Sequence, residues 1–190
     1  MFYRLIRCLA CIFGRILYRL RVTGTEYIPK EGAFILAGNH IHSYDPILLA
    51  IFNKRQVYFM GKRELFDRRF FGKFLRKLGA FPVDRQGTDI EAYRTTMAYL
   101  TKGKPVAIFS QGTRTSKFTN AKGGVAVFAL KAKVSIVPVG ISGSYKFFSK
   151  MYVNFGPPMS VEAYTGQKIK TELVDTVMND LIPRIESLLV

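Results

Sequence analysis

The sequence of 190 residues contains little cysteine and little histidine, and each shortage excludes a class of protein. Two cysteines, Cys8 and Cys11, cannot form a disulfide framework, so a reducing cytosolic setting is expected. Their C-x-x-C spacing lacks the strand-then-helix context of a redox motif. The whole chain has two histidines, so a binuclear zinc site of the H-x-H-x-D kind would lack its usual ligands. We therefore expect no metal.

Acidic residues are also scarce: 13 Asp and Glu stand against 29 Lys and Arg, which gives a net charge of +16. Such a surplus implies an anionic partner, which could be nucleic acid, an acidic lipid surface, a phosphorylated substrate or an acidic protein. No motif of a nucleic-acid-binding module appears and the basic residues are spread along the chain, so no nucleic acid is expected. Hydrophobic residues make up 48% of the chain, enough for one domain with a sizeable core.

The first 21 residues have the pattern of a basic amphipathic helix. At about 100° per residue, the apolar side chains fall within an arc of roughly 140° and the arginines lie opposite. The apolar set is Leu5, Ile6, Leu9, Ile12, Phe13, Ile16, Leu17 and Leu20, and the arginines are Arg4, Arg7, Arg15, Arg19 and Arg21. This pattern predicts a helix that lies in the interface of an anionic membrane, because arginines interrupt every stretch long enough to span it. The alternative is an ordinary helix packed on its own domain.

After residue 21, short apolar runs alternate with helical patterns, which predicts an α/β sandwich. The expected strands are 21–23, 33–37, 57–60, 80–83, 105–109, 134–141 and 152–155, and the expected helices begin at 45, 70, 89, 125 and 170. Pro138 interrupts one strand, so that strand is expected at an edge or with a bulge.

The segment 38–46, G-N-H-I-H-S-Y-D-P, is the centre of the functional argument. His40 directly follows a predicted strand, and Asp45 is expected to be the N-cap of the next helix with Pro46 as its first residue. Open α/β sheets bind their ligands at such strand ends. A carboxylate here can fix the tautomer of an imidazole that takes a proton from a hydroxyl. The alternative is that Asp45 is only a cap and His40 an ordinary loop residue.

Two further strands are followed by residues suited to binding an anion. Asp84 and Arg85 come after one strand, and Gly112, Thr113 and Arg114 after another. If these strand ends lie together, a base, a carboxylate that orients it and two guanidinium groups converge on one crevice.

Four blocks, in order and at compatible spacings, now identify a family. Residues 39–45 match N-H-x4-D; residues 61–66 match the second block, with 81–85 as its D-R continuation; residues 109–115 match F-P-E-G-T-R-S; and 136–140 match V-P-V. Together they resemble the lysophosphatidic acid acyltransferases of the bacterial PlsC type, over about residues 22–158. The resemblance implies a single-domain open mixed sheet flanked by helices, the glycerolipid acyltransferase fold. It would span 22–190, behind an interfacial helix at 1–21.

The resemblance also implies a reaction. His40, oriented by Asp45, would act as general base on the free hydroxyl of lysophosphatidic acid, giving phosphatidic acid in phospholipid synthesis. The acyl group would come from a thioester of coenzyme A or acyl-carrier protein, with no resident cofactor. No covalent acyl-enzyme is expected, since no G-x-S-x-G motif is present and neither cysteine is near the histidine. The enzyme would be peripheral, on the cytoplasmic face of the cell membrane.

The resemblance assigns the substrate site residue by residue. Arg85 and Arg114, with Lys62 as a third cation, would hold the acceptor phosphate. The other expected substrate-binding residues are Asn39, Gln111, Gly112 and Thr113. His42, which an extended loop would place on the same face as His40, is expected to have a supporting or neutral role.

The third block departs from the family pattern at Ser110 and Gln111, which stand where the family has proline and glutamate. Glutamine keeps a hydrogen-bond acceptor but loses the charge. This leaves open a weakly active or non-catalytic lipid-binding relative. Another lysophospholipid, or glycerol 3-phosphate, stays open as the acceptor.

Overall fold

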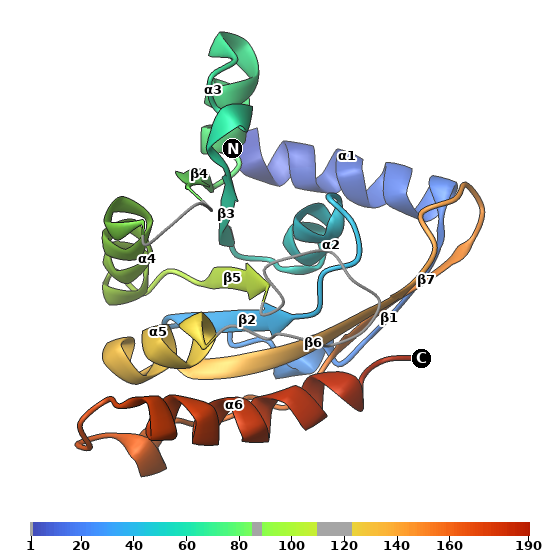
Figure 1. Cartoon of the computed structure of the whole chain (residues 1–190). Helices are drawn as coiled ribbons and strands as arrows, with labels where there is room; N and C mark the ends of the chain where they lie inside the picture. The colour runs from blue at the N-terminus through green and yellow to red at the C-terminus, as the bar shows by residue number, and fades with distance from the viewer. Residues whose placement is uncertain (1, 85–88, 110–122) are drawn as a thin grey trace.

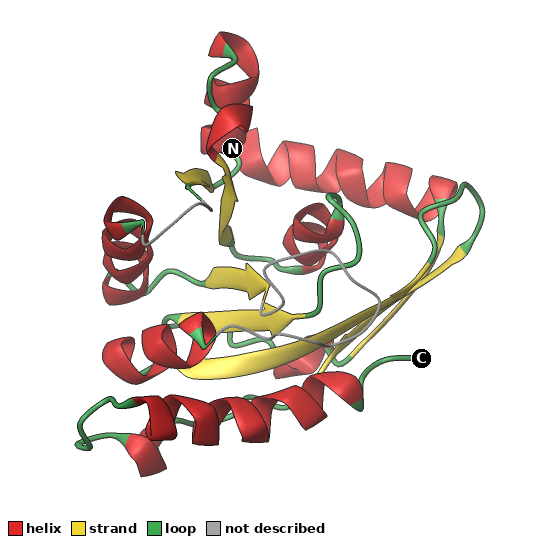
Figure 2. Cartoon of the chain, viewed as in Figure 1, coloured by secondary structure: helices red, strands yellow, loops and turns green. Residues whose placement is uncertain are grey.

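A computed structural model describes residues 2–84, 89–109 and 123–190 of the chain (Figure 1). The helices are α1 (Phe2–Leu17), α2 (Asp45–Phe52), α3 (Arg69–Lys77), α4 (Ile90–Thr101), α5 (Gly124–Ala132) and α6 (Thr171–Glu186). The strands are β1 (Arg19–Thr23), β2 (Phe34–Gly38), β3 (Tyr58–Lys62), β4 (Ala80–Val83), β5 (Val106–Phe109), β6 (Ser135–Gly143) and β7 (Lys150–Phe155). Strands and helices alternate along the chain (Figure 2), so the predicted α/β class is confirmed.

The strands of the described residues form one seven-stranded sheet in the order β1-β7-β6-β2-β5-β3-β4. Neighbouring strands are parallel except β6 and β7, which are antiparallel, so the sheet is mixed as expected. Helices α1 and α2 lie on one face of the sheet, and α5 and α6 lie on the other (Figure 1). Because β2, β5, β3 and β4 are parallel, their carboxyl ends lie along the same edge of the sheet, the one that runs across the strand ends. The predicted site residues follow these strand ends in the sequence.

The central strand β2 explains why the sheet is covered on both faces. Its hydrophobic residues 34–37 are all fully buried. Because side chains alternate across a strand, Phe34 and Leu36 pack into the core beneath α2, while Ile35 and Ala37 pack into the core beneath α5 and α6. An uninterrupted apolar run is what a parallel strand buried on both faces requires.

The expectation for Pro138 is wrong: β6 is neither an edge strand nor bulged at this residue, but lies between β2 and β7. The pairing of β6 with β7 begins at Val139, which lies opposite Phe155, the last residue of β7. Pro138 comes before this paired stretch, and the Pro138 carbonyl accepts a hydrogen bond of 2.9 Å from the amide of Gly156. The amide hydrogen that proline lacks would point to the same side, where no strand partner needs it.

The amino-terminal helix is shorter than expected. It ends at Leu17, and residues 19–23 form β1, which pairs with β7. The sequence R-L-R-V-T has the two-residue alternation of an edge strand, and the helical wheel obscured that alternation. Arg19, Leu20 and Arg21 are therefore not part of the helix.

Helix α1 contacts α2 through one of its expected solvent-facing arginines. Arg7 is half-buried, and its guanidinium donates a 3.0 Å hydrogen bond to the carbonyl of Ile51 near the end of α2. Tyr3 donates to the carbonyl of Ala50 at 3.3 Å. A cation beside the last carbonyls of a helix is stabilising, so Arg7 has a structural role.

Most of the apolar side of α1 is exposed. Its exposed members are Phe2, Leu5, Leu9, Ile12, Phe13 and Ile16. The ring of Phe2 contacts that of Phe74 on α3, where Phe70 and Phe71 are exposed as well. Among the described residues, no helix combines the length and the apolar character needed to cross a membrane.

Candidate active site

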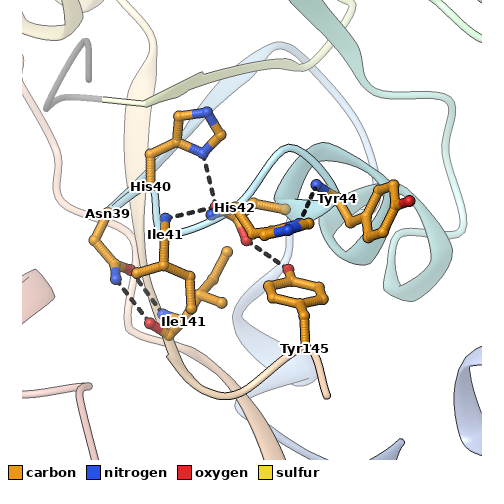
Figure 3. A network of polar contacts seen from close by, with 8 residues as sticks. Asn39, His40, Ile41, His42, Tyr44, Ile141 and Tyr145 are labelled. Carbon is orange, nitrogen blue, oxygen red and sulfur yellow. Dashed lines mark hydrogen bonds and ion pairs between the residues drawn. The ribbon is translucent and has the colours of Figure 1, made fainter. Parts of the chain in front are cut away.

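His40, labelled in Figure 3, lies just after the carboxyl end of β2 and forms a buried pair with Asp45. The Nδ1 atom of His40 lies 2.7 Å from Oδ2 of Asp45, with 5% of His40 and none of Asp45 exposed. With the Nδ1 hydrogen directed to the carboxylate, Nε2 is the ring atom with a lone pair for a proton. The imidazole also stacks on the ring of Phe109 at 4.3 Å, at the end of β5. The local sequence pattern therefore predicted correctly that His40 and Asp45 lie side by side.

Asp45 is not the N-cap that the sequence suggested. Helix α2 begins at Asp45 itself, and Tyr44 is at the N-cap position without a side-chain capping bond. The carboxylate instead turns back on the loop, where Oδ2 accepts hydrogen bonds from the amides of Ile41 at 2.7 Å and His42 at 2.8 Å. Asp45 thus binds both the loop and the imidazole, and does not cap α2.

The second carboxylate oxygen is bonded to a residue far away in the sequence. The hydroxyl of Tyr145, which follows β6, donates to Oδ1 of Asp45 at 2.5 Å. Burial of the phenol, and next the charge of Asp45, raise the pKa of Tyr145 far above its usual value, so the group stays a donor. Sequence reasoning missed Tyr145, because no local motif surrounds it and the contact joins residues 100 positions apart.

Asn39 anchors the start of the loop to β6. Its side-chain amide donates to the carbonyl of Ile141 at 2.7 Å and accepts from the amide of the same residue at 2.8 Å. Only 4% of Asn39 is exposed. The structure therefore gives Asn39 a positioning role beside His40, and its predicted contact with substrate stays a prediction.

His42 does not share a face with His40. The loop turns at this point, with the amide of Asp45 donating to the carbonyl of His42 at 3.1 Å. The His42 ring consequently stacks on Tyr145 at 4.4 Å and lies 4.8 Å from the ring of Tyr44, away from the His40 imidazole (Figure 3). The loop is not extended, so the shared face is not formed, and the supporting or neutral role of His42 stays a prediction.

The predicted phosphate-binding residues are only partly described. Lys62 ends β3 at the same edge as His40, with β5 between β3 and β2, and forms a 2.9 Å exposed ion pair with Glu64. Five predicted site residues lie outside the described residues: Arg85, Gln111, Gly112, Thr113 and Arg114.

Asp89, the N-cap of α4, is bonded to Asp84, the last described residue before Arg85. Its carboxylate accepts from the amides of Asp84 at 2.6 Å and Ala92 at 2.8 Å. Those two amides, and then the nearby Arg63 guanidinium at 3.4 Å, lower the pKa of Asp89. The cap predicted for this helix is confirmed. Asp84 and Asp89, which flank residues 85–88 in the sequence, are thus joined by a hydrogen bond.

No metal site is formed by the part of the chain that the structure describes, in the sense that no three His, Cys, Asp or Glu residues are grouped to hold one. His40 uses Nδ1 for the carboxylate, and His42 is packed between tyrosines. The geometry suits proton transfer: one imidazole, a buried carboxylate that orients it, and an edge of the sheet at which further loops begin.

Comparison with known proteins identifies the family. The model of the family described as Acyltransferase matches residues 19–142. The chain is 31% identical over 176 residues to the 1-acyl-sn-glycerol-3-phosphate acyltransferase of Bacillus subtilis, covering 88% of each chain. It is 34% identical over 163 residues to the enzyme of that name from Streptococcus pneumoniae, covering 82% of this chain and 60% of the relative. The chain therefore belongs to the acyltransferase family.

The fold agrees with a solved structure. The crystal structure of the 1-acyl-sn-glycerophosphate (LPA) acyltransferase, PlsC, from Thermotoga maritima matches with a TM-score of 0.76 at 24% identity. The match covers 98% of this chain and 79% of that one. The glycerolipid acyltransferase fold inferred from the resemblance is thereby confirmed.

Proposed function

We propose that this chain is a 1-acyl-sn-glycerol-3-phosphate acyltransferase, which transfers a fatty acyl group from a thioester to the free hydroxyl of lysophosphatidic acid and so forms phosphatidic acid. The buried His40–Asp45 pair is the observation that carries the proposal. Two relatives at 31% and 34% identity have this name, and the acceptor is taken from them.

His40 is the general base of the proposed reaction. Nε2 takes the proton of the acceptor hydroxyl while the oxygen attacks the thioester carbonyl, and Asp45 stabilises the imidazolium that forms. The tetrahedral intermediate then expels the thiolate, which takes up the proton from the imidazolium and leaves as a thiol. The new ester bond replaces the thioester bond, and the enzyme ends in its starting protonation state. No acyl group is attached to the protein.

The acceptor phosphate would be bound by Arg85, Arg114 and Lys62. Lys62 is the described member and is exposed at the same edge of the sheet as His40. Guanidinium groups bind phosphate oxygens in pairs, which fixes the orientation of the acceptor. Gln111 would keep the hydrogen-bonding role of the family glutamate, with Gly112 and Thr113 beside it. The donor is acyl-CoA or acyl-carrier protein, each of which is acidic and suits a chain of net charge +16, and no resident cofactor takes part.

The protein would act from the surface of an anionic membrane, on its cytoplasmic face. Leu5, Ile12, Phe13 and Ile16 on α1 are each at least 50% exposed, although burial is the rule for such residues elsewhere in the chain. Arg4 and Arg15 are exposed on the same helix, which contains no acidic residue. An exposed apolar side flanked by arginines is the pattern of a helix that lies in a lipid interface.

The first test is lysophosphatidic acid dispersed in detergent with acyl-CoA or acyl-carrier protein thioester, with products identified by mass. Phosphatidic acid is expected with wild type, and His40→Ala should lower kcat about 10³-fold, the scale of a lost general base. His42→Ala is the matched control, because it removes the neighbouring ring and should change kcat only a few-fold. If His40→Ala retains a rate within a few-fold of wild type, the proposed mechanism is wrong. If product forms with glycerol 3-phosphate and not with lysophosphatidic acid, the acceptor is glycerol 3-phosphate and the proposed acceptor is wrong.

A further inference from the structure

The connection between β6 and β7, residues 144–149, carries two phenylalanines that the core does not use. Phe147 is 69% exposed and Phe148 is 67% exposed. Lys146 and Lys150 on either side are exposed as well. Two adjacent aromatic side chains of this size leave most of their apolar surface in water.

The backbone holds these rings outward. Phe148 has a φ of 61°, in the left-handed region that a bulky residue rarely adopts. Its amide donates to the carbonyl of Leu17 at 2.7 Å, and the carbonyl of Ser149 accepts from Arg19 at 2.9 Å. The ring of Phe147 stacks with that of Tyr18, with 6.5 Å between centroids. The strained residue is therefore fixed in place by contacts to the chain that follows α1.

The two phenylalanines follow closely on the carboxyl end of α1 in space. Leu17 ends that helix, and Figure 1 shows the β6–β7 connection beside this end. The charge of these two segments has one sign: residues 2–25 and 144–161 contain several Lys and Arg but no Asp or Glu. Apolar side chains among cations alone are complementary to anionic lipid, whose headgroups attract the cations while the acyl region receives the rings.

We propose that Phe147 and Phe148 insert into the surface of an anionic bilayer, as a second lipid contact beside α1. This inference rests on the proposed function, because a membrane acceptor gives the contact its use. Tyr145, in the same connection, donates to Asp45, so the inserted rings would set the height of the catalytic pair above the lipid. A single helix could roll on the surface, whereas two separate contacts fix the orientation of the domain.

The absence of tryptophan from the chain gives a direct test. Phe148→Trp places one fluorophore at the tip, and Ile90→Trp places one on α4, where the native residue is 58% exposed and outside this surface. With vesicles of phosphatidylcholine and phosphatidylglycerol, the tip fluorophore should shift to the blue and be quenched by brominated lipid, while the α4 fluorophore should show neither effect. An unshifted tip fluorophore on protein that sediments with the vesicles would overturn the proposal. A shift that appears without lipid as protein concentration rises would assign the rings to a second copy of the chain.

A second variant tests the energetic contribution. The double variant Phe147→Ser, Phe148→Ser should weaken binding to the same vesicles about ten-fold or more, as expected for removing two apolar rings from the interface. Its rate on detergent-dispersed lysophosphatidic acid should equal that of wild type, because neither ring touches the catalytic pair. Unchanged vesicle affinity would contradict the lipid contact. Absence of acyl transfer in the wild-type protein would contradict the proposed function instead, and the fluorescence result would still decide the contact.

Discussion

Asp45 and Asp89 occupy similar places in the fold and have different tasks. Each follows a strand end at the same edge of the sheet and lies at the start of a helix. Asp89 is outside α4 as its N-cap and accepts from an amide of the first helical turn. Asp45 is the first residue of α2 and accepts from the loop that precedes it. Asp89 also accepts from the amide of Asp84 before the helix, so the difference is that one oxygen of Asp89 caps α4, whereas the oxygens of Asp45 bond to the preceding loop, His40 and Tyr145.

Pro46 explains why Asp45 is available for this task. The first turn of a helix has amide hydrogens without partners, and a cap normally satisfies one of them. Proline has no amide hydrogen, so α2 has one fewer group to satisfy. The carboxylate can then accept hydrogen bonds from His40, Ile41 and His42, while fewer amide hydrogens at the start of α2 need an acceptor. A proline directly after an aspartate thus removes part of the need for that aspartate as a cap.

The largest effect should come from Asp45→Asn. The amide keeps the size but lacks the charge that stabilises the imidazolium, and it can present an N–H to Nδ1 and so favour the wrong tautomer. We expect kcat to fall roughly 10²- to 10⁴-fold. Asp89→Asn is the matched control and should leave kcat within two-fold or so. Steady-state kinetics with both variants checks this. Equal losses of kcat in the two would show that Asp45 has no special role in catalysis.

Arg85→Ala should have the next largest effect, on acceptor binding. This residue follows Asp84 in the sequence, and its guanidinium is proposed to hold the acceptor phosphate. Loss of a charge-assisted hydrogen bond, worth about 1.4 kcal/mol, should raise KM for lysophosphatidic acid about ten-fold and leave KM for the thioester unchanged. Arg63→Ala removes a cation at the same edge that already pairs with Asp89, and serves as control. An unchanged acceptor KM would place the phosphate elsewhere.

Tyr145→Phe should have a smaller effect on rate, with a specific signature. The variant leaves Oδ1 of Asp45 without its donor, so more of the carboxylate charge acts on the imidazole. We expect a few-fold loss of kcat, and the acid limb of the pH profile of kcat/KM should move to higher pH. Measured profiles of wild type and variant decide this. A loss of rate with an unmoved limb would mean that Tyr145 only packs against His42.

Asp89→Ala should have the smallest effect on catalysis and act on stability instead. Because the pKa of Asp89 is lowered in the folded protein, its contribution is fully present above the unfolded value of about 3.9 and is lost as pH falls through the folded pKa. The melting temperature of the variant should therefore be below that of wild type at pH 7, and the gap should shrink at acid pH. Glu91→Ala, on the same helix, provides the comparison. A gap that stays constant down to pH 3 would contradict this origin.

Local patterns predicted what local forces decide. The apolar run 33–37, the cap at Asp89 and the loop that holds His40 each depend on neighbours in the sequence, and the structure has them. The residue at which α1 ends and the position of Pro138 inside the sheet both depend on pairing with β7, which is far away in the sequence and cannot be read from a local pattern. Tyr145 depends on a contact across 100 residues, so only the assembled sheet could reveal it.

The Asn39 tether bears on how the molecule comes apart on heating. An asparagine amide has the same donor and acceptor as a peptide group, and here it continues the ladder between β2 and β6 by one side chain. We therefore expect the loop that holds His40 to unfold together with the central strands and not to open separately. The amide hydrogens of Ile41 and His42, bonded to a buried carboxylate, should exchange with deuterium as slowly as those of β2. Loss of activity with temperature should accordingly coincide with melting of the whole domain.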